Sequence, residues 1–152
     1  MNRRGVLFFV LAAAVLAQGC SVNRATAKVS PGVDLGKVKT VYVVQEKGDD
    51  RAIDRLILAQ LTQMGYAATS GPEIPRPYKA DASLDYADKW MWDLTMYMLE
   101  LTVTVKNPEN GSLMAVGNSF HTSLSRKAPE SMVEEVLTNI FRNAPAAGGE
   151  VK

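Results

Sequence analysis

Three aspartates alternate with aromatic side chains in the middle of the chain. They are Asp85, Asp88 and Asp93, and the aromatic residues among them are Tyr86, Trp90 and Trp92. Two carboxylates held about 5 to 10 Å apart can share acid and base roles in glycoside hydrolysis. The same side chains can also recognise a glycan or a protein without catalysis, or simply cap turns and fill the end of a sheet. The pattern leaves catalysis, recognition and packing as alternatives.

Other catalytic or metal-binding chemistry lacks the side chains that it needs. His121 is the only histidine and Cys20 the only cysteine, so a zinc site built from these ligands is not expected. The sequence contains neither a Gly-x-Ser-x-Gly elbow nor a Gly-rich phosphate loop. We therefore predict that the protein is not an enzyme and has no catalytic residues, no metal and no cofactor, and we interpret His121 as structural.

The single cysteine ends a segment with the pattern of an export signal. Arg3 and Arg4 precede an apolar run, 6–17, which is too short to remain as a membrane-spanning helix. Leu16-Ala17-Gln18-Gly19-Cys20 resembles a bacterial lipobox. This resemblance implies removal of residues 1–19 and acylation of Cys20, and two or three acyl chains anchor a protein stably where one does not.

The expected location and partners follow from this anchor and from the charge. Ser21 follows the cysteine, and by resemblance to the enterobacterial sorting rule it favours the outer membrane, with the protein facing the periplasm. Without Arg3 and Arg4 the 17 basic residues become 15 against 16 acidic residues. Nucleic-acid binding needs a clustered basic face, so we expect no nucleic-acid partner. The expected partners are the membrane, another envelope protein, or further copies of this chain.

The remaining chain has the length of one globular domain. Residues 20–37 are small and polar with Pro31-Gly32 as a breaker, which predicts a tether between lipid and domain. Residues 38–143 carry the hydrophobic periodicity of one α+β domain, and residues 144–152 are predicted to form a flexible tail.

Two segments have the apolar spacing of amphipathic helices. The first presents Ile53, Leu56, Ile57, Leu61 and Met64 on one side, and the second presents Met132, Val133, Val136, Leu137, Ile140 and Phe141. Asp49 or Asp50 can accept hydrogen bonds from the free amides at the start of the first helix, and Gly65 suits its end. Pro129 is tolerated in the first turn of the second helix.

The expected strands are 38–45, 66–69, 81–92, 94–106 and 113–122. Asp88 interrupts an apolar face and predicts a bulge nearby, and residues 107–111 with Asn110-Gly111 predict a hairpin turn. In the last strand we assign Met114, Val116 and Phe120 to the core and expect Gly117 to permit a close neighbour. The predicted fold is a two-layer α+β sandwich: a mainly antiparallel sheet of four to five strands with two helices on one face.

The long strand 94–106 is apolar on both sides in its first half. Alternation assigns Tyr97, Leu99, Leu101, Val103 and Val105 to the core. It leaves Leu94, Met96 and Met98 on the helix-free face, where something must cover them. Together with Trp90, Trp92 and Asp93 these three residues are our candidate binding surface.

The same stretch carries a family resemblance. Trp90-Met91-Trp92-Asp93, followed by Tyr97-Met98, resembles the Trp-x-Trp-Asp-x-x-x-Tyr-Met signature of a group of small uncharacterised proteobacterial lipoproteins. Met64-Gly65-Tyr66 and the order of elements over 38–141 are similar as well. More distantly, the architecture resembles envelope lipoproteins of the curli-secretion and TolB N-terminal type, whose α/β domains act through protein contacts and sometimes as rings. These resemblances bring no catalytic residues.

The sequence thus predicts an outer-membrane lipoprotein whose domain is a non-catalytic binding or assembly module of the cell envelope. One alternative is a glycan-acting enzyme that uses Asp85, Asp88 and Asp93. Another is an inhibitor or immunity-type lipoprotein, which a prominent exposed loop over 71–79 would favour.

Overall fold

The computed structural model describes residues 23–143. Six strands are present: β1 (Arg24–Val29), β2 (Thr40–Val44), β3 (Ala67–Gly71), β4 (Ala82–Asp93), β5 (Thr95–Lys106) and β6 (Leu113–Phe120). The helices are α2 (Ile53–Gln63) and α3 (Pro129–Thr138), which continues into a π-helical turn, η3 (Asn139–Asn143). Short 3-10 turns, η1 (Leu35–Lys37) and η2 (Ser123–Ser125), lie in two of the connections. The predicted signal residues 1–19, the predicted acyl acceptor Cys20 and the predicted tail 144–152 lie outside the described residues.

All six strands form one mixed sheet in the order β1-β6-β5-β4-β2-β3. The central run β6-β5-β4 is antiparallel, whereas β2 is parallel to both of its neighbours. The prediction of four to five strands was wrong by one, because β1 lies inside the segment predicted to be a tether and pairs antiparallel with β6. Arg24-Ala25-Thr26-Ala27-Lys28-Val29 does alternate polar with apolar residues, but two of the three apolar residues are alanines, so the strand pattern was weak and the segment was assigned to the tether instead.

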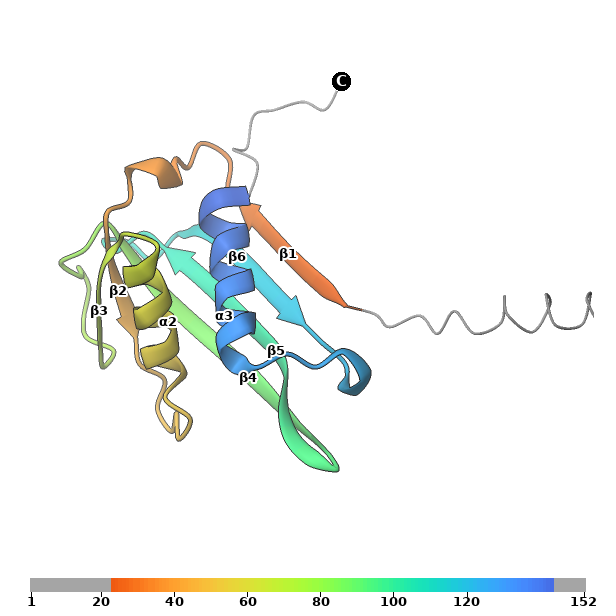
Figure 1. The fold of residues 1–152 in the computed structure, drawn as a ribbon. Helices are drawn as coiled ribbons and strands as arrows, with labels where there is room; N and C mark the ends of the chain where they lie inside the picture. Colours follow the sequence, from red (N-terminus) through yellow and green to blue (C-terminus); the bar gives the residue numbers. More distant parts are fainter. Residues whose placement is uncertain (1–22, 144–152) are drawn as a thin grey trace, which may run out of the picture.

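Both long helices cover the same face of the sheet, as predicted (Figure 1). The apolar stripe of α2 buries Ile53, Ile57 and Leu61, and that of α3 buries Met132, Val133, Val136 and Leu137. They meet the inward side chains Val41, Val43, Leu84, Leu101, Val103 and Val105 of the sheet. The result is the two-layer core expected when helices repeat their apolar side chains about every 3.6 residues and strands repeat theirs about every 2.0 residues.

The predicted roles of Asp49 at the start of α2 and of Gly65 at its end are confirmed. The Asp49 carboxylate accepts hydrogen bonds from the amides of Arg51 (3.0 Å) and Asp54 (3.2 Å). Gly65 follows the helix with a φ of 95°, the left-handed conformation that glycine adopts without a steric cost. At the other predicted turn, Gly111 has a φ of 76° and its amide donates to the Asn107 carbonyl, which closes the hairpin between β5 and β6.

A bulge reverses the facing of the first half of β5. The β4–β5 register shifts between Lys89 and Trp90, where Leu99 is the extra residue on β5. Because side chains alternate, one extra residue moves every preceding side chain to the other face. The predicted bulge near Asp88 is thus confirmed, but the assignment of Leu99 to the core and of Met98 to the open face was wrong: Leu99 is half-buried and Met98 is 1% exposed within the core.

Strand β6 also faces the opposite way from the prediction. Its small residues Ala115, Gly117 and Ser119 point to the helices, whereas Val116 and Phe120 are half-buried on the other face. Met114, the extra residue at a second register shift, is partly buried and packs against the core as predicted. A Cβ built on Gly117 would lie 2.7 Å from Cγ1 of Ile140, so the helical layer approaches this strand too closely for large side chains. The expected close neighbour of Gly117 is confirmed, and it explains why the larger apolar residues face outward.

Within residues 23–143, no helix is both long and apolar enough to cross a membrane.

Candidate functional site

The hairpin between β4 and β5 projects beyond the other strands (Figure 1). It ends in exposed apolar side chains. We call residues 91–96 the hairpin tip. The exposed fractions are 47% for Met91, 69% for Trp92, 87% for Leu94 and 46% for Met96. Leu124 in η2 is 93% exposed. Large apolar side chains gathered in this way mark a contact site more often than they mark a stabilising feature.

Leu94 occupies an unfavourable conformation at the end of this hairpin. Its φ is 56°, in the left-handed region where a residue with a Cβ pays about 1–2 kcal/mol. A turn of this kind is normally occupied by glycine, asparagine or aspartate. Neither burial nor backbone preference therefore accounts for a leucine at this position.

The η2 turn is attached to the hairpin tip through Arg126. The guanidinium donates to Oγ1 of Thr95 (2.7 Å), lies 4.0 Å from the Asp93 carboxylate and stacks 4.9 Å from the centre of the Tyr97 ring. Leu124 is two residues away in the chain. The apolar tip and Leu124 consequently belong to one end of the molecule.

The six residues of the predicted binding surface do not all lie at this end. Trp92, Asp93, Leu94 and Met96 do. Trp90 is half-buried: its indole Nε1 donates to Asp88, and the Arg51 guanidinium lies 3.9 Å from the ring centre. Met98 belongs to the core, because the bulge at Leu99 turns it inward. Exposed Met91 and Leu124 were missed, since local alternation does not show which residues lie beyond the edge of a sheet.

The three aspartates do not converge. Asp85 pairs with Lys106, Asp88 accepts from Trp90, and Asp93 lies near Arg126. Asp85 and Asp88 are three positions apart on one strand and therefore point to opposite faces. Asp85 and Asp93 share a face but are separated by roughly 26 Å of strand. The spacing of about 5 to 10 Å that glycoside hydrolysis needs is not formed by these residues.

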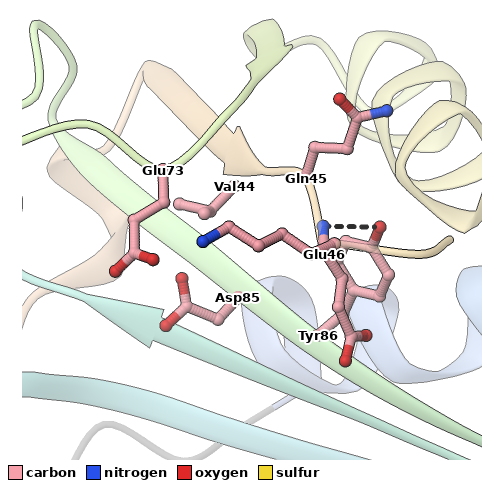
Figure 2. Close-up of a pocket in the computed structure, with 7 residues that line it drawn as sticks. Val44, Gln45, Glu46, Glu73, Asp85 and Tyr86 are labelled. Carbon is pink, nitrogen blue, oxygen red and sulfur yellow. Dashed lines mark hydrogen bonds between the residues drawn. The ribbon is translucent and has the colours of Figure 1, made fainter.

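A solvent-open cleft of about 330 Å³ lies where β2 ends and β4 continues past it. Figure 2 shows the carboxylates of Glu73 and Asp85 on one side of this cleft and that of Glu46 on the other. Val44, Gln45, Lys47 and Tyr86 complete the lining. Because Asp85 is paired with Lys106, the charges at this cleft are partly neutralised.

Tyr86 closes the bottom of this cleft and fixes the loop before α2. Its hydroxyl donates to the Asp49 carboxylate (2.7 Å) and accepts from the Glu46 amide (3.2 Å; Figure 2). Burial, followed by the hydrogen bond to Asp49, raises the pKa of Tyr86 above its ordinary value. Burial alone would raise the pKa of Asp49, but the hydrogen bonds from Tyr86 and from backbone amides hold it below its ordinary value. The two groups thus form a hydrogen-bonded unit that ties the loop before α2 to β4.

A second polar cluster, which the sequence did not predict, joins β6 to α3. The Glu135 carboxylate accepts from Oγ of Ser119 (2.6 Å), pairs with Nε2 of His121 (2.8 Å) and pairs with Nζ of Lys127 (2.5 Å). Burial would raise the pKa of Glu135, but these three partners lower it to about 2. Ser119 and His121 both bind the carboxylate instead of each other, so the nucleophile-to-base contact of a serine triad is not formed. The interpretation of His121 as structural agrees with this geometry.

The loop over 71–79 is held against the sheet. Tyr78 is 6% exposed, and its ring stacks on that of Tyr42 with 4.8 Å between their centres. Arg76 donates to the Asn107 carbonyl (3.0 Å). Residues 72–77 and 79 are nevertheless exposed, so the loop is fixed at Tyr78 and Arg76 and accessible along most of its length. Among residues 23–143, no group of three or more His, Cys, Asp or Glu side chains could hold a metal ion.

Comparison with known proteins identifies a shared fold and no family. No protein-family model matches the chain, and no curated protein matches it. The chain is similar to a subunit of the PelC dodecamer from Paraburkholderia phytofirmans, with a TM-score of 0.59 and 17% identity over 79% of this chain and 99% of that one. A leucine-to-methionine variant of the same dodecamer gives a TM-score of 0.58 and 17% identity over 82% and 99% of the two chains.

TolB from Acinetobacter baumannii reaches a TM-score of only 0.34, with 11% identity over 73% of this chain and 28% of that one, which is too low to establish a common fold. The resemblance based on the Trp90 to Met98 motif remains a prediction. What these likenesses establish is that residues 23–143 adopt the α+β fold of a PelC subunit.

Proposed function

We propose that this chain is an outer-membrane lipoprotein whose α+β domain serves as a non-catalytic binding or assembly module on the periplasmic side. The observation that carries this proposal is the hairpin tip. It concentrates exposed apolar side chains, including a leucine in a left-handed conformation, where contact with a binding partner, a lipid bilayer included, would bury them. The lipobox-like sequence ending at Cys20 supports attachment to the membrane.

Self-association is the form of assembly that we consider first. The PelC subunits with the same fold form a dodecamer. This chain also ends its sheet in two edge strands, β1 and β3, whose outer backbone groups are free to pair or to be covered. A ring or other closed oligomer of this chain is thus part of the proposal.

Substitution of Cys20 by alanine is expected to abolish incorporation of labelled palmitate in growing cells, because the thiol is the acyl acceptor of a lipobox. The measurement is labelled palmitate on the chain after immunoprecipitation. Ser21→Ala is the matched control, since it changes the neighbouring residue and keeps the acceptor. A wild-type chain without label contradicts the proposed anchor.

Crosslinking in intact cells is expected to give adducts of the chain with itself or with a second envelope protein, identified by mass spectrometry. The Cys20→Ala chain should give fewer adducts, because loss of the anchor lowers its local concentration at the membrane. An anchored chain that yields only the monomer at every crosslinker length speaks against an assembly module.

A further inference from the structure

The hairpin tip and the segment that leads to Cys20 leave the domain at the same end of the sheet. Arg24, the first residue of β1, pairs with Phe120 on β6, and Phe120 pairs with Glu100 on β5. Because β1 is antiparallel to β6, the chain before Arg24 runs off the end where β6 stops. The β4–β5 hairpin extends past this row of three residues in the same direction (Figure 1).

The lengths of the two extensions are comparable. From Glu100 to Leu94 the hairpin covers roughly 20 Å at the rise of an extended strand. Cys20 precedes Arg24 by four residues in the sequence, and such a segment spans at most about 14 Å. If the strands stand perpendicular to the membrane, the hairpin tip of a domain anchored at Cys20 therefore reaches about 6 Å or more farther toward the membrane than Cys20 does. This is the depth, about 5–10 Å, at which apolar side chains of interfacial proteins lie.

The side chains at this end suit the boundary between lipid head groups and acyl chains. Leu94 and Leu124 are 87% and 93% exposed and purely apolar, and Trp92 combines an apolar ring with one N–H donor. Tryptophan is enriched at membrane interfaces because its polar edge can stay among the head groups. Arg126 lies 4.0 Å from Asp93, so the carboxylate at this end has a cation beside it.

We propose that the hairpin tip and Leu124 insert into the same bilayer leaflet that holds the acyl groups of Cys20, so that lipid and hairpin together fix the orientation of the domain. The bilayer is thus assigned as the partner of the apolar tip. This inference rests on the proposed lipid attachment, because the short segment before β1 is what brings the tip to the membrane.

The test uses the full lipidated chain in vesicles of phosphatidylethanolamine and phosphatidylglycerol. Trp90→Phe leaves Trp92 as the only tryptophan, and circular dichroism checks that this variant is folded. Acyl chains brominated near the head group quench tryptophan on contact. Trp92 emission is expected to shift to shorter wavelength and to be strongly quenched by these lipids. In the reciprocal Trp92→Phe chain, half-buried Trp90 should lose less of its emission.

A pair of charge substitutions provides the matched control. Leu94→Asp in the Trp90→Phe chain is expected to restore most of the Trp92 emission, since it replaces the most exposed apolar side chain of the tip by a second carboxylate beside Asp93, whose own charge has Arg126 at 4.0 Å. Leu113→Asp should leave the quenching unchanged. Leu113 is also an exposed apolar residue, at 48%, but it pairs with Lys106 at the opposite end of the sheet.

Each contrary result has a distinct meaning. An acylated, vesicle-bound chain whose Trp92 is not quenched by bromolipids overturns the inference and leaves the anchor standing. If Trp92 of the vesicle-bound chain is also shielded from iodide, the tip is covered by protein and not by lipid. That result overturns the membrane-insertion inference equally. A wild-type chain that carries no acyl groups overturns the proposed anchor, and the inference falls with it.

Discussion

Replacing Glu135 by alanine is expected to lower the free energy of unfolding by about 2–4 kcal/mol, because it removes the shared acceptor of two buried groups. Ser119 is fully buried and His121 is 3% exposed. Within residues 23–143, Glu135 is the carboxylate that Oγ of Ser119 and Nε2 of His121 both bind, and no second carboxylate bonds to either atom. Urea denaturation followed by circular dichroism measures the loss as a lower transition midpoint at unchanged slope.

Glu134→Ala is the matched control, since Glu134 is adjacent on the same helix and exposed. Its effect should stay within about 0.5 kcal/mol, as for other surface substitutions. Equal losses for the two variants would mean that helix α3 responds to charge in general and that the Glu135 cluster does not tie it to β6.

The same cluster makes stability depend on pH in a defined direction. The pKa of Glu135 is lowered from 4.5 to about 2 in the folded chain, so its contribution is complete above the unfolded value and is lost as the pH falls from about 4.5 toward 2. Since the Glu135 side chain is 20% exposed, solvent screening reduces this contribution to about 1–2 kcal/mol. The Glu135→Gln chain should show a correspondingly flatter decline over that range.

Replacing Gly117 by valine is expected to cost about 2–3 kcal/mol in spite of the better strand propensity of valine. A Cβ at this position would lie 2.7 Å from Cγ1 of Ile140 and 2.9 Å from Cγ2 of Val136. Both of these residues are buried against the sheet, so neither can move away without opening the interface with α3. The measurement is again the midpoint of urea denaturation.

The steric cause can be isolated with a double-mutant cycle. Ile140→Ala alone should cost about 2–4 kcal/mol by leaving a cavity. When Ile140→Ala is combined with Gly117→Val, the valine refills part of that cavity. The loss of unfolding free energy in the double variant should therefore be smaller than the sum of the two single losses, by at least about 1 kcal/mol. If the two single losses of unfolding free energy simply add in the double variant, the valine destabilises strand β6 itself and does not act through a clash with Ile140.

The placement of the tip at the membrane would leave other surfaces for protein contacts. The helix-free face carries paired charges, such as Lys89 with Glu100 at 2.7 Å. One of its apolar residues, Phe120, is covered by the Arg24 guanidinium, 5.4 Å from the ring centre. A polar, paired surface of this kind suits a wet interface between subunits more than a hydrophobic one.

Features determined by neighbouring residues could be predicted from the sequence. The apolar stripe after Asp49 predicts α2 because a 3.6-residue period has one structural meaning, and Gly65 marks its end for the same local reason. Pro129 and the stripe behind it predict α3, and Asn110-Gly111 predicts the hairpin turn. The interruption at Asp88 also indicated the bulge, since an inward carboxylate breaks the alternation of a strand.

Features that depend on partners distant in the chain were decided only by the tertiary structure. The polar strand β1 exists because β6 offers it a free edge, and β6 faces as it does because η3 packs close to Gly117. One extra residue, Leu99, moved Met98 from the candidate surface into the core.

The candidate site likewise has features that could be predicted from the sequence and others that only the fold decided. The sequence by itself determined that apolar side chains gather near Trp92 and Leu94, since their residue types are visible without a fold. Only the tertiary structure decided that they project past the end of the sheet, on the side where the chain leads back to Cys20. The physical reason is that residue type and period are local properties, whereas face, register and the end of a sheet are set by pairing between strands far apart in the sequence.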